Sequence, residues 1–173
     1  MQSNLYRNLR YDWPLHVVRL VCTVLPDNVV FIRFRGFLYG LFLKSCGRRF
    51  GVGRNVVFYN PGNISIGSDV YIAQGTWISA SRGVTIGDEV LFGPYVIVAT
   101  TNHTKVDGSY RFGPPEGGEV VIEKGSWIGA HTTIGAGVTI GSGTAIGANS
   151  FVNKDVASDV VAAGIPAKVV RKG

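Results

Sequence analysis

The chain is poor in charged residues and in sulfur-containing residues. Only 16% of its 173 residues are charged, with one methionine and two cysteines, whereas about 25% is usual for charged residues in a soluble domain. Cys22 and Cys46 form no CxxC pair and have no histidine-rich neighbours with which to share a metal. We therefore expect two buried thiols and no metal site.

The sequence also lacks an apolar run long enough to cross a bilayer. The runs from Leu15 to Leu25 and from Phe37 to Leu43 are both short and are separated by Pro26 and several arginines, whereas a spanning helix needs roughly 20 apolar residues. The first run contains Arg19 and is followed by no small-residue cleavage site, so a signal peptide is not expected. These absences predict a cytoplasmic protein.

What the chain has in excess is glycine and a repeat of six residues. Glycine occurs 24 times, and aliphatic residues return at every sixth position from residue 122 onward. The same spacing, with small insertions, runs upstream as Ile66, Ile72, Ile78, Ile86, Phe92 and Val98 and continues as Ile122, Ile128, Ile134, Ile140, Ile146 and Val152. A period of six fits neither a helix nor an ordinary strand. It predicts an all-β solenoid whose triangular coils have three short sides, each pointing one aliphatic side chain to the axis.

This repeat, together with Thr101-Asn102-His103, Trp127-Ile128-Gly129-Ala130 and the tail from Ala163 to Lys168, resembles the hexapeptide-repeat acyltransferases. The resemblance covers roughly residues 50–173 and implies a left-handed parallel β-helix that works as a homotrimer. The expected organisation is a basic, apolar and partly helical N-terminal segment at 1–50, the β-helix at 51–157 and a C-terminal tail near the cofactor at 158–173. Because this fold also hosts other activities, the site residues must decide the function.

The repeat is interrupted between Val98 and Ile122, and residues 100–118 are expected to form an extruded loop. Catalytic groups often lie on loops that a rigid scaffold positions. His103 stands where the chain leaves the coil, and an imidazole there can accept the proton of an attacking hydroxyl near neutral pH. We therefore expect His103 to be the general base of an acyl transfer.

By its resemblance to the galactoside and maltose acetyltransferase branch, the sequence implies further roles. The backbone N–H of Ala130 is the expected donor to the oxyanion, and Trp127 is expected to line the pantetheine channel. Gly147 and Ala148 would leave room for the pantetheine arm, while Lys168 and Arg171 are expected to bind the phosphates of acetyl-CoA.

The acceptor is harder to predict. Where the galactoside and maltose branch carries an acceptor-contacting asparagine, a gap-free reading places Gly75, so free small sugars are doubtful acceptors. The layout more closely resembles acetyltransferases of surface-polysaccharide and O-antigen pathways. Candidates for contact with the acceptor are Tyr95, Asn102 and Asp107, and nothing in the sequence chooses between them and Asn60, Asn63, Tyr110 or Arg111.

The sequence thus predicts an acetyl-CoA-dependent O-acetyltransferase acting on a sugar hydroxyl of a surface glycan or its precursor, without metal or nucleic acid. N-acetylation of an amino sugar nucleotide, acetylation of an antibiotic and a non-catalytic trimeric scaffold remain alternatives. A zinc enzyme of this fold would need three converging histidines, and the repeat region contains only His103 and His131.

The N-terminal segment has two candidate roles. Residues 1–54 contain nine basic and two acidic residues, a net charge of +7, and the rest of the chain carries −1. The segment is expected to cap the open end of the β-helix. Its charge also favours contact with the anionic lipids at the inner face of the cytoplasmic membrane.

Overall fold

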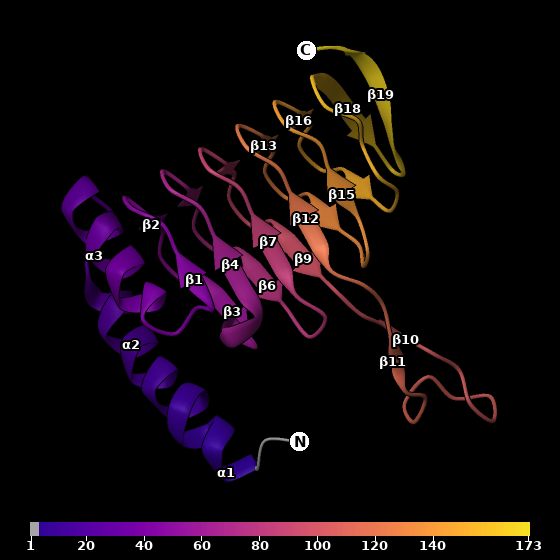
Figure 1. Cartoon of the computed structure of the whole chain (residues 1–173). Helices are drawn as coiled ribbons and strands as arrows, with labels where there is room; N and C mark the ends of the chain where they lie inside the picture. Colours follow the sequence, from indigo (N-terminus) through magenta and orange to yellow (C-terminus); the bar gives the residue numbers. More distant parts are fainter. Residues whose placement is uncertain (1–3) are drawn as a thin grey trace.

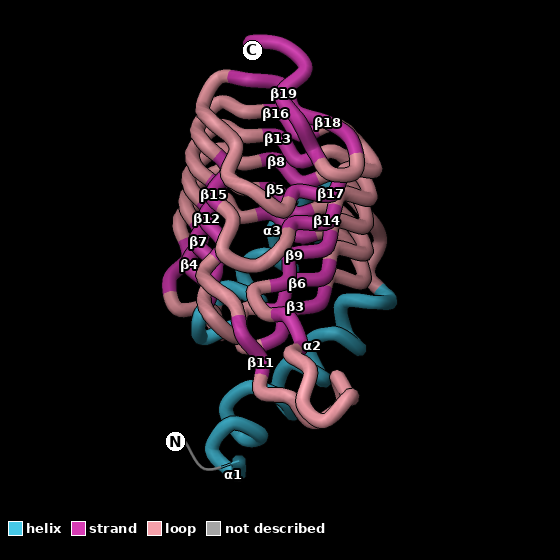
Figure 2. Tube along the Cα trace, turned by 90° about the vertical axis from the view of Figure 1, so that its right-hand side faces the viewer, coloured by secondary structure: helices cyan, strands magenta, loops and turns pink. Residues whose placement is uncertain are grey.

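The structure, a computed structural model, describes residues 4–173 and consists of a β-solenoid with helices at one end (Figure 1). Three parallel sheets form the sides of the solenoid, and the coils stack along its axis (Figure 2). The chain passes through sheets A, B and C in turn, and we call the intervening turns the AB, BC and CA corners. The prediction of a left-handed parallel β-helix is confirmed.

The strands of each coil are two or three residues long. Sheet A consists of β1 (Ser45–Cys46), β4 (Ile64–Ile66), β7 (Val84–Ile86), β12 (Val120–Ile122) and β15 (Thr139–Ile140). Sheet B consists of β2 (Gly51–Val52), β5 (Tyr71–Ile72), β8 (Leu91–Phe92), β13 (Trp127–Ile128), β16 (Ala145–Ile146), β18 (Val160–Gly164) and β19 (Ala167–Lys172). Sheet C consists of β3 (Val57–Tyr59), β6 (Trp77–Ser79), β9 (Ile97–Ala99), β14 (Thr133–Ile134) and β17 (Phe151–Val152).

The aliphatic repeat forms the core. Every predicted position from Ile66 to Val152 is buried, and ladder partners such as Ile86 and Ile122 lie directly above one another. Serines and threonines at some corners are buried as well, and most of them donate their hydroxyls to backbone carbonyls of an adjacent coil, as in Ser126 Oγ to Gly141 O at 2.9 Å. The core is therefore a continuous apolar column whose buried corner hydroxyls are hydrogen-bonded, except at Thr76, whose Oγ1 has no partner among the described residues.

The corners place one residue of each coil in the left-handed region of backbone conformation. At the BC corner these residues are Asn55, Gly75, Tyr95, His131 and Asn149. Asparagine and glycine adopt this conformation readily, whereas a bulky aromatic residue does so at a cost of about 1 to 3 kcal/mol. Tyr95 and His131, with φ of 57° each, therefore stand out in this ladder.

The N-terminal helices cover the first coil. They are α1 (Asn4–Arg7), the π-helix η1 (Asn8–Asp12), α2 (Trp13–Val24) and α3 (Val29–Gly40), and a 3₁₀ turn, η2 (Pro61–Asn63), lies at a CA corner. The Asn28 side chain caps α3 by accepting a hydrogen bond from Phe31 N at 3.1 Å. Figure 1 shows α2 and α3 lying across the end of the solenoid beside β1, β2 and β3.

Close packing joins α3 to the first coil. A Cβ at Gly36 would lie 2.0 Å from Phe50 O, so only glycine allows this approach. The fully buried Arg35 donates from Nε to Val52 O at 2.8 Å and forms an ion pair with Asp27. Tyr39 is buried beside Phe58, and burial raises the pKa of its hydroxyl to about 12. These contacts close the end of the β-helix.

The boundaries of these parts follow the strands. The first strand of sheet A begins at Ser45, and the extruded segment lies between β9 and β12, while the division at residues 50 and 157 stays a prediction.

Cys22 is buried as expected, and burial raises the pKa of its thiol. Cys46 is exposed although it is in register with the core residue Ile66, because β1 is the edge strand of sheet A and no further coil covers it, so the prediction that both thiols are buried was wrong. Within residues 4–173 no helix is long and apolar enough to span a membrane.

Candidate active site

His103 lies on a short hairpin that leaves the solenoid at a CA corner. The hairpin pairs β10 (Asn102–His103) with β11 (Pro115–Glu116), so that His103 stands opposite Pro115. Figures 1 and 2 show the hairpin projecting away from the coils, with the α1 end of the chain projecting on the same side. The His103 and Asn102 side chains are both exposed, so the imidazole is accessible to a substrate.

The root of the hairpin is fixed by hydrogen bonds to the coil below. Thr100 is fully buried, and its hydroxyl donates to Ser79 O at 2.9 Å and accepts from Arg82 N at 3.0 Å. The guanidinium of Arg82 donates to Pro115 O at 3.0 Å. Because Pro115 pairs with His103, Arg82 holds the strand pair that contains the candidate base. The sequence gives no local signal for this role, since Arg82 lies in the preceding coil.

Asp107 lies far along the hairpin, in its turn. Val106 and Ser109 exchange both backbone hydrogen bonds at 2.9 Å, and Asp107 and Gly108 between them have positive φ values of 48° and 81°. This is the backbone pattern of a tight two-residue turn, for which Asp-Gly is a preferred sequence. Asp107 is therefore explained by the turn, and contact with an acceptor remains a prediction.

The residues predicted to bind acetyl-CoA lie together on sheet B and the BC corner. Trp127 is half exposed on the outer surface of β13. Ala130 follows it at the BC corner, and Gly147 and Ala148 occupy the same corner one coil further on, where Asn149 N donates to Ala130 O at 2.9 Å. Within residues 4–173 the N–H of Ala130 donates to no backbone carbonyl, which leaves it available for an oxyanion.

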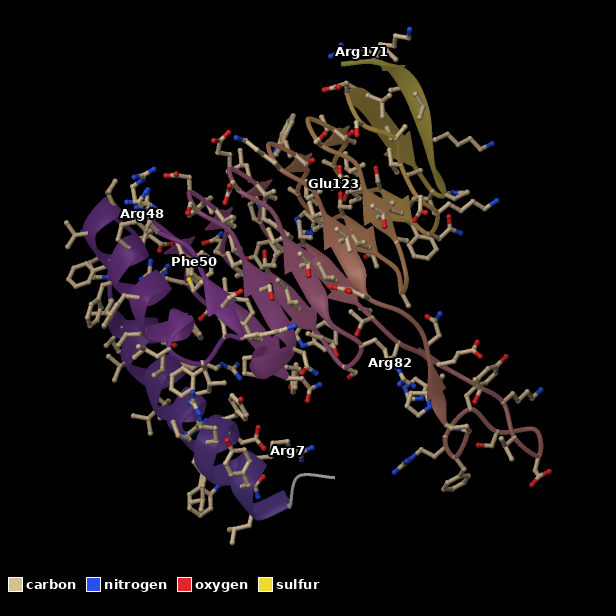
Figure 3. The ribbon with its side chains drawn as sticks, in the orientation of Figure 1. Arg7, Arg48, Phe50, Arg82, Glu123 and Arg171 are labelled. Carbon is tan, nitrogen blue, oxygen red and sulfur yellow. The ribbon has the colours of Figure 1, made fainter. Side chains whose placement is uncertain are left out.

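The C-terminal hairpin extends this surface. Strand β18 adds to β16, and β19 folds back on it with a register shift at Val161 and Ala162. Such a bulge interrupts the alternation of side chains, so that Lys168 and Arg171, three positions apart, share one face. Both side chains are exposed at the end of sheet B (Figure 3 labels Arg171). Their role in binding the phosphates of acetyl-CoA stays a prediction.

Tyr95 belongs to the BC corner rather than to the hairpin. Its ring stacks on His131, with centroids 5.1 Å apart and planes 15° apart. It also covers Gly75, where a Cβ would lie 2.3 Å from the Tyr95 ring. The ring thus fills the space above the position where the galactoside and maltose branch would carry its asparagine. The stack was not foreseen, because His131 looked like an ordinary outward residue of the repeat.

The structure therefore divides the predicted site into two groups. Sheet B and the BC corner hold Trp127, Ala130 and the other cofactor candidates, whereas His103 leaves from the CA corner, which lies opposite sheet B in the triangular coil. Within one chain the body of the prism separates His103 from Trp127. Among the described residues no three histidine, cysteine or acidic side chains gather as a metal site.

Comparison with known proteins defines the class. The family model described as "Bacterial transferase hexapeptide (six repeats)" matches residues 119–154. The solved structure of a galactoside acetyltransferase in complex with coenzyme A superimposes with a TM-score of 0.84 and 30% identity, covering 99% of this chain and 84% of that one. The protein belongs to the hexapeptide-repeat acetyltransferase family.

Two curated relatives show where in the family the similarity lies. The galactoside O-acetyltransferase of Escherichia coli (strain K12) is 39% identical over 117 residues, which span 68% of this chain and 58% of that enzyme. The putative lipopolysaccharide biosynthesis O-acetyl transferase WbbJ of the same organism is 29% identical over 175 residues, covering 90% of this chain and 87% of the relative. The chain thus matches little more than half of the galactoside enzyme but most of the second relative.

Proposed function

We propose that the protein transfers an acetyl group from acetyl-CoA to a sugar hydroxyl of a surface glycan or its precursor. The observation that carries this proposal is the exposed His103 on a hairpin fixed by Thr100 and Arg82, in a chain of this acetyltransferase family. The choice of acceptor is supported by the similarity to the putative lipopolysaccharide O-acetyl transferase over 90% of the chain. It is also supported by Gly75, which Tyr95 covers.

The chemistry is a direct attack on the thioester. The His103 imidazole takes the proton of the acceptor hydroxyl while its oxygen attacks the carbonyl carbon. The negative charge that forms on the carbonyl oxygen accepts a hydrogen bond from Ala130 N–H. Collapse of this intermediate breaks the carbon–sulfur bond, and the imidazolium returns its proton to the departing thiolate of CoA.

The active form is a homotrimer in which each site lies between two subunits. Outward side chains of sheets B and C include exposed apolar residues, among them Leu91 and Trp127 on sheet B and Tyr59, Ile97 and Phe151 on sheet C. The outward positions of sheet A are instead mostly serine and threonine, as in Ser65 and Thr85. Exposed apolar rows on two adjacent faces favour burial of sheet B of one subunit against sheet C of the next, which closes a ring of three.

This arrangement brings His103 to the neighbour's sheet B, which carries the cofactor candidates. His103 follows sheet C at the CA corner, and Trp127 is the first residue of the sheet B strand β13, just after the AB corner. Both corners adjoin sheet A, on the outside of the ring. Their strands lie in adjacent coils, because β9 pairs with β14 and β8 pairs with β13. A sheet C packed against a neighbour's sheet B therefore sets His103 opposite the neighbour's Trp127 at nearly the same height.

If the glycan is carried on a lipid, the enzyme meets it at the inner face of the cytoplasmic membrane. Residues 1–50 are then the segment that contacts the membrane. Of these, residues 1–3 lie outside the described residues. The decisive test is incubation of the purified protein with radiolabelled acetyl-CoA and a panel of acceptors: lipid-linked and free glycans, amino sugar nucleotides and aminoglycosides. Ester-linked label on a glycan supports the proposal. Amide-linked label on an amine would contradict it in favour of N-acetylation, and no transfer would favour a scaffold.

A further inference from the structure

The helices α2 and α3 have a second apolar surface that the β-helix does not use. Their inner residues, such as Leu15, Cys22 and Tyr39, are buried against the solenoid. A surface helix normally has one apolar stripe and a polar opposite face. Here both helices carry a further apolar stripe on the side away from the coils, and Figure 3 shows side chains projecting from them in that direction.

The stripe on α2 consists of Trp13, Val17, Leu20 and Val24, which follow one another at helical spacing. All four are more than half exposed, and Trp13 is 65% exposed. The residues on the inner side of α2, such as Leu15 and Cys22, cap the first coil. Capping therefore accounts for one side of α2 and leaves this stripe without a function in the single chain.

The stripe on α3 consists of Val30, Phe34 and Phe37, extends to Leu41 just after the helix, and continues into a groove. The groove has a volume of about 590 Å³, and its lining is mainly apolar. Phe37 and Leu41 line it together with Phe50 of the first coil, and Figure 3 shows Arg48 and Phe50 beside α3. The apolar surface of the helices is thus continuous with a hollow of a size that accommodates a hydrocarbon chain.

Cations surround this surface, and the acidic residues near it are already paired. Arg33 and Arg48 line the groove, together with Arg49, which forms an ion pair with Asp69. Of the two acidic residues in 1–54, Asp12 pairs with Arg7 at 3.5 Å, and Asp27 pairs with Arg35 and lies 3.6 Å from Arg54. An apolar surface with net positive charge is complementary to a layer that is apolar inside and anionic at its surface.

We propose that this outer surface of α2 and α3, with the groove, docks on an anionic phospholipid bilayer, the apolar stripes entering the acyl boundary and the arginines meeting the headgroups. A second copy of the chain is a poorer occupant. Residues 1–54 carry a net charge of +7, so two such surfaces in contact would repel each other. The inference extends the proposed function by naming the surface, and its test measures binding rather than acetyl transfer. Failure of either one is therefore distinguishable from failure of the other.

The test is sedimentation of the full-length protein with vesicles of phosphatidylglycerol or phosphatidylcholine. We expect co-pelleting with the anionic vesicles only, and release as salt screens the charges. The apolar variant Trp13→Ser, Leu20→Ser, Phe37→Ser removes three exposed side chains and should lower the bound fraction at least tenfold. The charge variant Arg33→Glu, Arg48→Glu should have an effect of similar size.

Matched controls carry the same chemical changes outside the surface. The triple variant Val106→Ser, Tyr110→Ser, Phe112→Ser removes three exposed side chains of the hairpin loop, and Lys105→Glu with Lys154→Glu makes the same change in net charge as the charge variant. Both should bind like the wild type, and all variants should melt at the same temperature by circular dichroism. The proposal is overturned if the wild type stays in the supernatant with anionic vesicles at low salt, or if the controls lose as much binding as the variants. It is also overturned if light scattering shows a six-subunit particle that the apolar variant abolishes.

Discussion

The CA corner and sheet B carry chemically different halves of the proposed site on opposite sides of one prism. The CA corner presents a histidine on a hairpin that two polar residues fix to the coil. Sheet B presents an aromatic side chain, an available amide N–H and a pair of cations on regular repeat coils. The difference teaches that the proposed base lies on an insertion into the repeat, whereas the proposed surface for an extended ligand consists of the repeat itself.

The largest effect is expected at the CA corner. Replacement of His103 by Ala should lower kcat by roughly 10²–10⁴-fold, because the hydroxyl loses its general base. The dissociation constant for acetyl-CoA, measured by calorimetry, should change little, since the binding residues lie on sheet B. Near-normal turnover of the purified variant would remove His103 from the mechanism.

Subunit mixing tests whether the two halves meet between chains. Ala148→Trp should block the pantetheine path on sheet B, since Ala148 is an exposed corner residue with ordinary backbone conformation. Trimers reassembled from equal amounts of the His103→Ala and Ala148→Trp chains should regain up to about one quarter of the wild-type activity, because one interface in four pairs two intact halves. A site within one chain predicts no recovery. Mixing each variant with itself under the same conditions provides the control.

A smaller effect is expected at the far end of sheet B. The double variant Lys168→Ala, Arg171→Ala should raise the KM for acetyl-CoA roughly tenfold through loss of charge-assisted hydrogen bonds to phosphates. The KM for a truncated pantetheine thioester, which lacks the adenosine phosphates, should stay within about twofold. Lys154→Ala serves as the matched control for an exposed cation elsewhere. Equal changes for both donors would show that β19 has only a structural role.

The smallest effect concerns the positioning of the hairpin. Arg82→Ala removes the hydrogen bond to Pro115 O, worth about 1 kcal/mol, and should lower kcat about fivefold while the KM for acetyl-CoA is unchanged. Hydrogen exchange of the β10 and β11 amides should accelerate in parallel. Lys105→Ala, a change within the same loop, should alter neither quantity. Unchanged exchange together with lower kcat would instead place Arg82 in contact with the acceptor.

The sequence was informative where structure is local and periodic. The six-residue spacing identified the core from Ile66 to Val152, and all these positions are buried. The break after Val98 located the hairpin, because an insertion is visible as a lost period. The cofactor candidates were chosen by resemblance, and the structure shows that they share one sheet and its corner.

Other features depend on contacts between distant parts of the chain. The link from Arg82 to Pro115 spans 33 positions, and the stack of Tyr95 on His131 joins residues of two successive coils. The exposure of Cys46 follows from its place on the edge strand of sheet A. The unused apolar side of α2 and α3 was also hidden, because an apolar run does not reveal how many sides of a helix the fold covers.

By itself, the sequence determined the solenoid, its core and the place of its one long insertion, because a period of six leaves each aliphatic side chain a single way to reach the axis. Tertiary structure alone decided that His103 and Trp127 stand on opposite sides of the prism and that Arg82 holds the hairpin. It also decided which surface of the helices stays uncovered. These outcomes depend on the stacking of coils and on the packing of helices against the first coil, and neither is encoded in the spacing of any short segment.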